Sequence, residues 1–154
     1  MQPISLKIED RINSLNGELT NAIEHYRRLA QWNYRLALML MTVTLCASAI
    51  AGIGGIFFGL TGQVAGGIAL LPGILALGTT VLKPQGRANW HYRKKDSLNA
   101  LRRRLAYEMP EPPSPDDISA ISSSWTELNA KMNEEWERNF TLSWTLFMKH
   151  GDQT

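Results

Sequence analysis

Residues 36–82 contain no Asp, Glu, Lys, Arg or His, and this uncharged stretch limits the folds that the chain can adopt. Only Thr61, Gly62 and Gln63 separate its two apolar runs, residues 36–60 and residues 64–82. As α-helices the runs would measure about 37 Å and about 28 Å, against a bilayer hydrocarbon core of roughly 30 Å. We therefore predict two transmembrane helices. The alternative is a helical hairpin buried in a soluble core, but the remainder of the chain is too polar to enclose one.

The basic residues indicate how these two helices are oriented. A three-residue connection makes the helices antiparallel neighbours, so both ends of the chain lie on one side of the membrane. Basic side chains flank the outer ends of both runs, while the connection carries none. By the positive-inside rule, we expect a multi-pass membrane protein with both termini in the cytoplasm. The residues expected at the membrane interface are Arg27, Arg28, Trp32, Arg35, Lys83, Arg87, Trp90 and Arg93.

The polar segment before the first span, residues 1–35, has apolar positions in alternating steps of four and three. This heptad stripe predicts an amphipathic cytoplasmic helix that runs into the first span. The stripe requires an apolar partner, either another helix of this chain or the same helix in a neighbouring subunit. Its members are Ile8, Ile12, Leu15, Leu19, Ala22, Tyr26 and Leu29.

The segment after the second span divides into a basic helix, residues 83–109, and an acidic helix, residues 116–154. Between them residues 110–115 form a hinge, because its prolines cannot lie inside a helix. Their opposite charges favour an antiparallel pair. Folding back about the hinge should bring Arg103 and Arg104 near Asp116 and Asp117, and Arg87 near Glu134, Glu135 and Glu137. The predicted fold is therefore all-α: a two-span transmembrane hairpin, a cytoplasmic N-terminal helix and a C-terminal helical pair.

Small residues recur at every fourth position of the first span and along one side of the second. Such faces let helices approach closely in lipid, where burial of apolar surface does not drive association. The chain has more small surface than one hairpin needs, so we predict a homo-oligomer. The helix-packing candidates are Ala47, Ala51, Gly55 and Gly59 in the first span and Ala65, Ala69 and Gly73 in the second. The pore-lining candidates are Thr44, Ser48 and Gly52.

The sequence carries no motif for catalysis or for cofactor binding. It has no phosphate-binding loop, dinucleotide fingerprint, HExxH or CxxC, and its three histidines lack the spacing of metal ligands. The arginine run at residues 102–104 favours lipid contact or intrachain pairing over nucleic acid. We therefore expect a protein that is not an enzyme and that uses no cofactor, metal or nucleic acid.

Two stretches at the membrane boundaries resemble a known family. "EHYRRLAQWNYRLALMLM" enters the first span, and "WHYRKKDSLNALRRRLAYE" follows the second. With the short hairpin between them, they resemble the SLATT family of bacterial two-span proteins over roughly residues 20–135. The resemblance implies a membrane effector in conflict or antiphage defence, which disrupts the membrane when a sensor fires. It further implies that a separate sensor protein or a signalling nucleotide supplies the trigger.

Two functions from different classes therefore follow from the sequence. One is an oligomeric channel or membrane-permeabilising pore, whose partners are the bilayer and further copies of the chain. The other is a non-conducting membrane anchor or scaffold, whose cytoplasmic helices recruit a partner. A holin-like lysis protein is a third reading, which the large cytoplasmic part disfavours. The surplus of small residues favours the pore, because an anchor does not need it.

Overall fold

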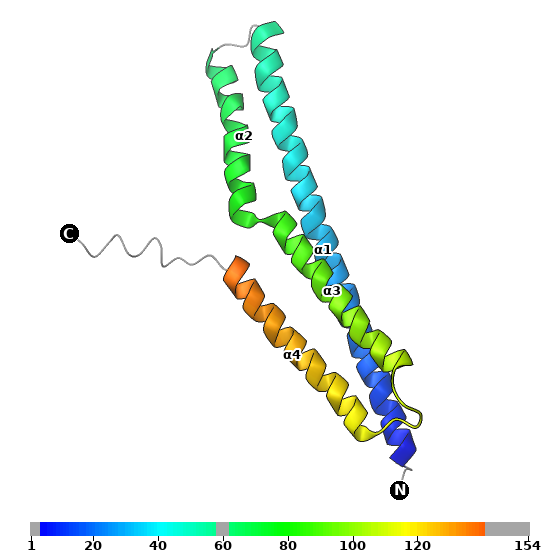
Figure 1. The fold of residues 1–154 in the computed structure, drawn as a ribbon. Helices are drawn as coiled ribbons and strands as arrows, with labels where there is room; N and C mark the ends of the chain where they lie inside the picture. Colours follow the sequence, from blue (N-terminus) through cyan, green and yellow to red (C-terminus); the bar gives the residue numbers. More distant parts are fainter. Residues whose placement is uncertain (1–3, 58–61, 141–154) are drawn as a thin grey trace, which may run out of the picture.

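The computed structural model describes residues 4–57 and 62–140 of the chain, and every regular element in these ranges is an α-helix. The helices are α1 (Ile4–Phe57), α2 (Gly62–Leu82), α3 (Pro84–Tyr107) and α4 (Pro115–Phe140). Figure 1 shows α1 running almost the full length of an elongated molecule, with α2 beside its upper half and α3 and α4 beside its lower half. The predicted all-α fold is confirmed. The predicted C-terminal segment beyond residue 140 lies outside the described residues.

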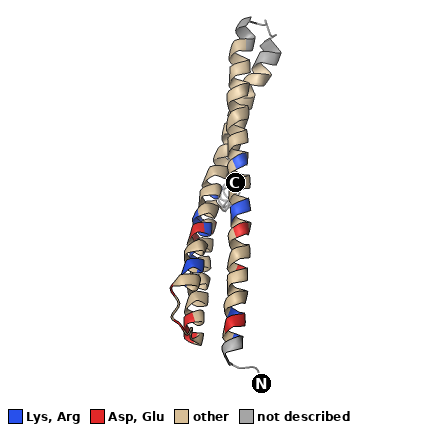
Figure 2. Ribbon diagram, turned by 90° about the vertical axis from the view of Figure 1, so that its right-hand side faces the viewer, with Lys and Arg blue, Asp and Glu red and all other residues tan. Residues whose placement is uncertain are grey.

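The first span and the predicted N-terminal helix are one continuous helix in the structure. α1 contains 54 residues and passes through the predicted boundary at residues 35 and 36 without a break. It has no proline after residue 3, and Gly17 alone interrupts its polar half, so no residue there ends the helix. In Figure 2 the charged residues are confined to the lower half of the molecule.

Two stretches of the described chain are long and apolar enough to cross a membrane, one within Lys7–Ile53 and one within Gly66–Tyr107. Their large apolar side chains face outward: Leu45 is 60% exposed and Leu77 is 69% exposed. The described chain therefore does not enclose the hairpin in a soluble core, and this alternative is wrong for the single subunit.

An elbow at Lys83 joins the upper and lower halves of the molecule. Lys83 adopts the left-handed conformation, with φ 45° and ψ 48°, between the last residue of α2 and Pro84 at the first position of α3. Its backbone N–H still donates to the carbonyl oxygen of Thr79 at 3.0 Å. The chain bends here because Pro84 has no N–H with which to continue α2 and disfavours a right-handed helical residue before it.

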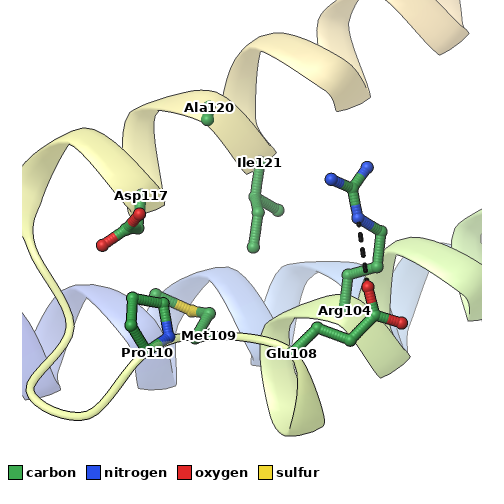
Figure 3. A pocket seen from close by; sticks show the side chains of 7 residues that line it. All are labelled: Arg104, Glu108, Met109, Pro110, Asp117, Ala120 and Ile121. Atoms are coloured by element: carbon green, nitrogen blue, oxygen red, sulfur yellow. Dashed lines mark ion pairs between the residues drawn. The ribbon is translucent and has the colours of Figure 1, made fainter.

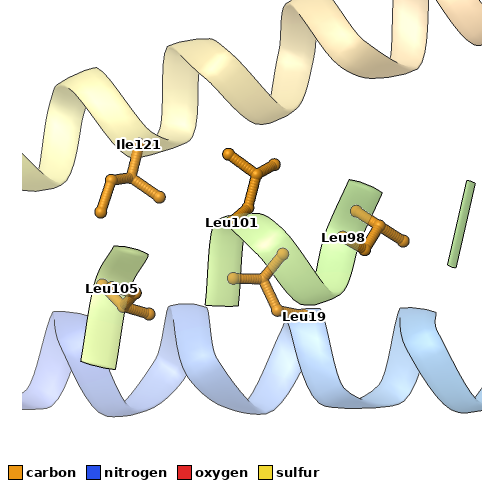
Figure 4. Packing of buried hydrophobic residues seen from close by; sticks show 5 residues of the cluster. All are labelled: Leu19, Leu98, Leu101, Leu105 and Ile121. Carbon is orange, nitrogen blue, oxygen red and sulfur yellow. The ribbon is translucent and has the colours of Figure 1, made fainter. Parts of the chain in front are cut away.

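The core of the lower half lies where α1, α3 and α4 meet, and α3 is the central helix (Figure 4). Leu19 of α1 and Leu98 of α3 are fully buried, and the stripe of α1 packs on α3. The partner of the predicted heptad stripe is therefore another helix of the same chain. The buried members of this core are Leu19, Leu98, Leu101, Leu105 and Ile121.

The turn between α3 and α4 lies at the predicted hinge, and a local cap begins α4. α4 begins with a capping box, in which the Asp117 N–H donates to Ser114 Oγ at 3.2 Å and Ser114 Oγ donates to Asp117 Oδ2 at 2.6 Å. Hydrogen bonds from the Ser114 hydroxyl and backbone lower the pKa of Asp117. Arg104 Nε lies 3.6 Å from Glu108 Oε2. Both residues line a small cavity that Asp117 also lines (Figure 3). Arg104 and Asp117 thus line the same cavity but form no ion pair, and Ser114 donates to the Asp117 carboxylate instead.

Candidate functional site

The two predicted spans contact one another through a small face of α1 and an apolar face of α2. Ala47 is 7% exposed, and Thr44 and Ala51 are half-buried on the same side of α1. Four half-buried positions of α2 have steps of four, three and four, which is the spacing of one helical face. They are Ile68, Pro72, Leu75 and Thr79. The candidates Ala47 and Ala51 therefore lie inside the hairpin, whereas Gly55 belongs to α1 and Gly59 lies outside the described residues.

The small residues of α2 lie on its outer side. Ala69 and Gly73 are both exposed, and Ala65 belongs to the same helix. A Cβ atom added at Gly66 or Gly73 would meet no atom of another element within 4 Å. These two glycines are seven residues apart and so share one side of α2. We call the outward side that carries Gly66, Ala69 and Gly73 the outer glycine face.

The first span also has an open glycine. Gly52 has nothing within 4 Å of an added Cβ, and Ser48 is exposed one turn before it. Thr44, the third pore-lining candidate, is half-buried, and its hydroxyl donates to the carbonyl oxygen of Leu40 at 2.8 Å. Ser48 and Gly52 thus share an open flank of α1, while Thr44 lies nearer the contact with α2.

Directly below the spans, α3 inserts a cationic side chain between aromatic rings. Lys94 is 2% exposed, and its Nζ lies 4.6 Å from the ring centroid of Tyr26 and 5.1 Å from that of Trp90. Its Nζ also donates to Asn133 Oδ1 at 3.5 Å. Aromatic faces attract cations, and the attraction is stronger away from water. We call Tyr26, Trp90, His91, Lys94 and Trp136 the cation–aromatic cluster.

The rings of this cluster join three helices. Trp90 of α3 lies 4.7 Å from Trp136 of α4 between ring centroids, and its Nε1 donates to the carbonyl oxygen of Met132 at 3.2 Å. The His91 ring is stacked on Tyr26 of α1 at 5.9 Å. Burial, followed by the nearby charges of His25, Lys94 and Arg87, lowers the pKa of His91 to about 4. His91 is therefore neutral at pH 7 and acts as a packing ring.

The residues expected at the membrane interface fall into two groups. Trp32 is 68% exposed and Arg35 is exposed, both at the start of the apolar part of α1, where aromatic and basic side chains suit a membrane interface. Trp90 is only 4% exposed, and the Arg87 guanidinium lies 5.6 Å from the ring centroid of Trp136. These two residues lie in the bundle, and Arg87 stacks on an aromatic ring rather than pairing with the acidic residues of α4.

Three of the remaining interface candidates make ion pairs, and the fourth makes a hydrogen bond. Arg27 and Arg28 both bond to Glu24, which lowers the pKa of the Glu24 carboxyl to about 2. Arg93 pairs with Glu135 across α3 and α4. Lys83 Nζ donates to the carbonyl oxygen of Asn139 at 3.3 Å, so the end of α4 contacts the elbow.

Sequence reasoning missed the cation–aromatic cluster, although a signal for it was present. Positions 87, 90, 91 and 94 lie on one face of α3. Lys94 comes four residues after Trp90 and four before Leu98, so it occupies a position of the apolar stripe to which both belong. A lysine in an apolar stripe is expected at the surface, and only the rings of two other helices make its burial favourable.

Among the described residues, no group of three or more His, Cys, Asp or Glu side chains is arranged to hold a metal ion. Comparison with protein-family models, curated proteins and solved structures gives no match. The function is therefore argued from the two features above, the open glycines of the spans and the cluster beneath them.

Proposed function

We propose that this chain is an oligomeric integral protein of the bacterial inner membrane, with both termini in the cytoplasm, and that its assembly forms a channel or permeabilising pore. The outer glycine face carries the proposal. Glycine in a helix costs about 1 kcal/mol relative to alanine. Inside one subunit no atom of another element lies within 4 Å of a Cβ added at Gly66 or Gly73, so packing within the subunit does not require glycine there. Close packing of a second copy of the chain against this face explains why glycine is present there.

The decisive experiment replaces Gly73 by Leu in the full-length chain. Because an added Cβ meets only open space at this position, the single subunit keeps its fold, and any loss arises between subunits. We expect the mass of the detergent-extracted complex to fall towards the monomer. Dye leakage from vesicles should decrease by roughly tenfold or more, which requires only about 1.4 kcal/mol of lost association.

Gly17→Leu is the matched control, because Gly17 is equally open but lies in the lower half of α1. It should change neither the mass nor the leakage. A Gly73→Leu protein that assembles and leaks as the wild type does would contradict the proposed use of the glycines. Circular dichroism of both variants checks that the helices are retained.

A non-conducting membrane anchor is the second candidate, and the polar groups of the spans favour it. The hydroxyls of Thr42, Thr44 and Thr80 each donate to a carbonyl oxygen of their own helix, at 2.9, 2.8 and 2.9 Å. Residues 36–82 also contain no charged side chain that could coordinate an ion. Wild-type protein that assembles in vesicles without releasing dye or ions supports the anchor and excludes the pore.

The resemblance to the SLATT family extends the proposal to a bacterial defence effector that a separate sensor protein or signalling nucleotide triggers. The link between bundle and spans supports such control. The end of α4 contacts the elbow through Asn139, and a Cβ at Gly86 would lie 3.1 Å from Phe140 Cε1. A trigger that moves α4 would therefore act at the base of α2. Leakage that rises when α4 is cross-linked to α3 would contradict this mode of control.

A further inference from the structure

A groove at the elbow lies between all three helices that meet there. Tyr34, Leu38 and Met41 of α1 line one side, and Thr79 of α2 with Gln85 of α3 line the other. Its volume is about 240 Å³, and three of its α1 residues are more than half exposed: Tyr34 by 54%, Leu38 by 55% and Met41 by 61%. The groove is thus open along the side of the molecule.

The groove crosses the boundary between the polar and the apolar parts of α1. Leu38 and Met41 belong to the uncharged stretch that begins at residue 36, whereas Tyr34 lies before it and Gln85 follows the elbow. One end of the groove therefore offers apolar side chains and the other offers hydroxyl and amide groups. This polarity suits a ligand with an apolar tail and a polar head.

Two basic residues are sequence neighbours of residues that line the groove, although neither is itself a lining residue. Arg35 follows Tyr34 in α1, and Lys83 precedes Pro84, which also lines the groove. Within the described residues neither of them forms an ion pair, although Arg27, Arg93 and Arg104 farther from the spans do. Lys83 Nζ donates to one backbone carbonyl oxygen, which leaves its charge uncompensated. An anionic head group is the complement that these charges require.

We propose that the elbow groove binds an anionic phospholipid, with one acyl chain along Leu38 and Met41 and the phosphate held by Arg35 and Lys83. The inference rests on the proposed membrane location and names a specific lipid site within it. A bound lipid would connect α1 to the elbow at the base of α2. It would thereby hold the spans to the bundle.

Native mass spectrometry of the full chain in detergent tests the site with two lipids of identical acyl chains, phosphatidylglycerol and phosphatidylcholine. We expect the wild type to retain phosphatidylglycerol preferentially. The double variant Arg35→Gln, Lys83→Gln should lose roughly ten- to thirty-fold of this preference, as expected for two basic side chains facing anionic lipid. Arg103→Gln, an exposed arginine at the far end of α3, is the matched control and should keep the preference.

A second variant tests the acyl-chain part of the groove. Ala37 also lines it, so Ala37→Phe should fill it and weaken retention of both lipids. Val43→Phe, on an exposed position of the same span, should not. Excess inorganic phosphate should fail to displace the lipid. Displacement by phosphate, equal retention of both lipids by the wild type, or an unaffected Ala37→Phe variant would each overturn the proposal.

Flotation with vesicles separates this proposal from the one on which it rests. Wild-type chain that fails to float refutes the membrane location itself. Chain that floats, yet shows no preference for phosphatidylglycerol, refutes the elbow site alone. Unchanged helical content by circular dichroism excludes misfolding as the cause in each variant.

Discussion

Lys94 Nζ lies 4.6 Å from the ring centroid of Tyr26, so a cation of α3 contacts α1 through the face of an aromatic ring. The same ammonium group faces Trp90 at 5.1 Å and reaches Asn133 of α4 at 3.5 Å. One buried charge therefore touches all three helices of the bundle. Rings and an amide oxygen surround it where a carboxylate would usually be found.

Replacements of Lys94 separate the contribution of its charge to the stability of the bundle from the contribution of its volume. Lys94→Ala should lower the stability of the bundle by about 2 kcal/mol or more, because it leaves a cavity and removes the cation from both rings. Lys94→Met should retain most of the stability, since a buried charge is often replaced by an apolar side chain of similar size without loss. Denaturant unfolding followed by the fluorescence of Trp90 and Trp136 measures both. Lys94→Met as unstable as Lys94→Ala would show that the charge itself is essential.

Gly86 and Phe140 should be energetically coupled. A Cβ at Gly86 would lie 3.1 Å from Phe140 Cε1, which is closer than an ordinary van der Waals contact. Gly86→Leu should therefore displace the end of α4 and destabilise the bundle, while the same change in a Phe140→Ala background should cost about 1 kcal/mol less. A double-mutant cycle in thermal unfolding gives the coupling. Additive effects would show that Phe140 does not rest on this glycine in solution.

The stability of the bundle should depend on pH through His91. Its pKa is about 4 in the folded protein, below the ordinary value of 6.5, because the ring is buried beside Lys94, Arg87 and His25. Between these values the unfolded chain binds more protons than the folded chain. The contribution of His91 to stability is therefore complete above pH 6.5 and decreases as the pH is lowered towards 4. Below pH 4 it changes no further.

A His91→Phe variant tests this dependence, because it keeps a ring and cannot be protonated. Its melting temperature should change less than that of the wild type between pH 6.5 and pH 4. Glu24 affects stability in a lower pH range. Because its pKa is about 2, its contribution to stability is lost only as the pH falls from 4.5 towards 2. Equal slopes for the two proteins above pH 4.5 would assign the effect to another group.

The Ser114 cap should stabilise the start of α4. Ser114→Ala removes the acceptor for the Asp117 N–H and the donor to its carboxylate, and should cost about 1 kcal/mol. Ser122→Ala, at an exposed position within the same helix, is the control and should have little effect. Hydrogen exchange of the first turn of α4 reports the local loss. Equal protection in the two variants would mean that the cap contributes nothing.

Local features of the sequence were sufficient to predict an all-α chain and its break at the Pro-rich hinge. The uncharged stretch of residues 36–82 is long and apolar enough for two helices that could cross a membrane, and the hinge prolines lack the N–H that a helix needs. Each effect depends on residues close together in the chain. The four helices and the hinge were therefore predictable from the sequence alone.

Contacts between distant parts of the chain decided the rest. The sequence showed that small residues were abundant in the spans, but not that Ala47 lies inside the hairpin while Gly73 faces outward. It placed Arg104 near Asp117 without showing which group bonds this carboxylate, and it did not show that Lys94 is buried. The rotation of each helix depends on side chains of three helices packing together. Only the tertiary structure determines which glycine is open and which lysine is enclosed.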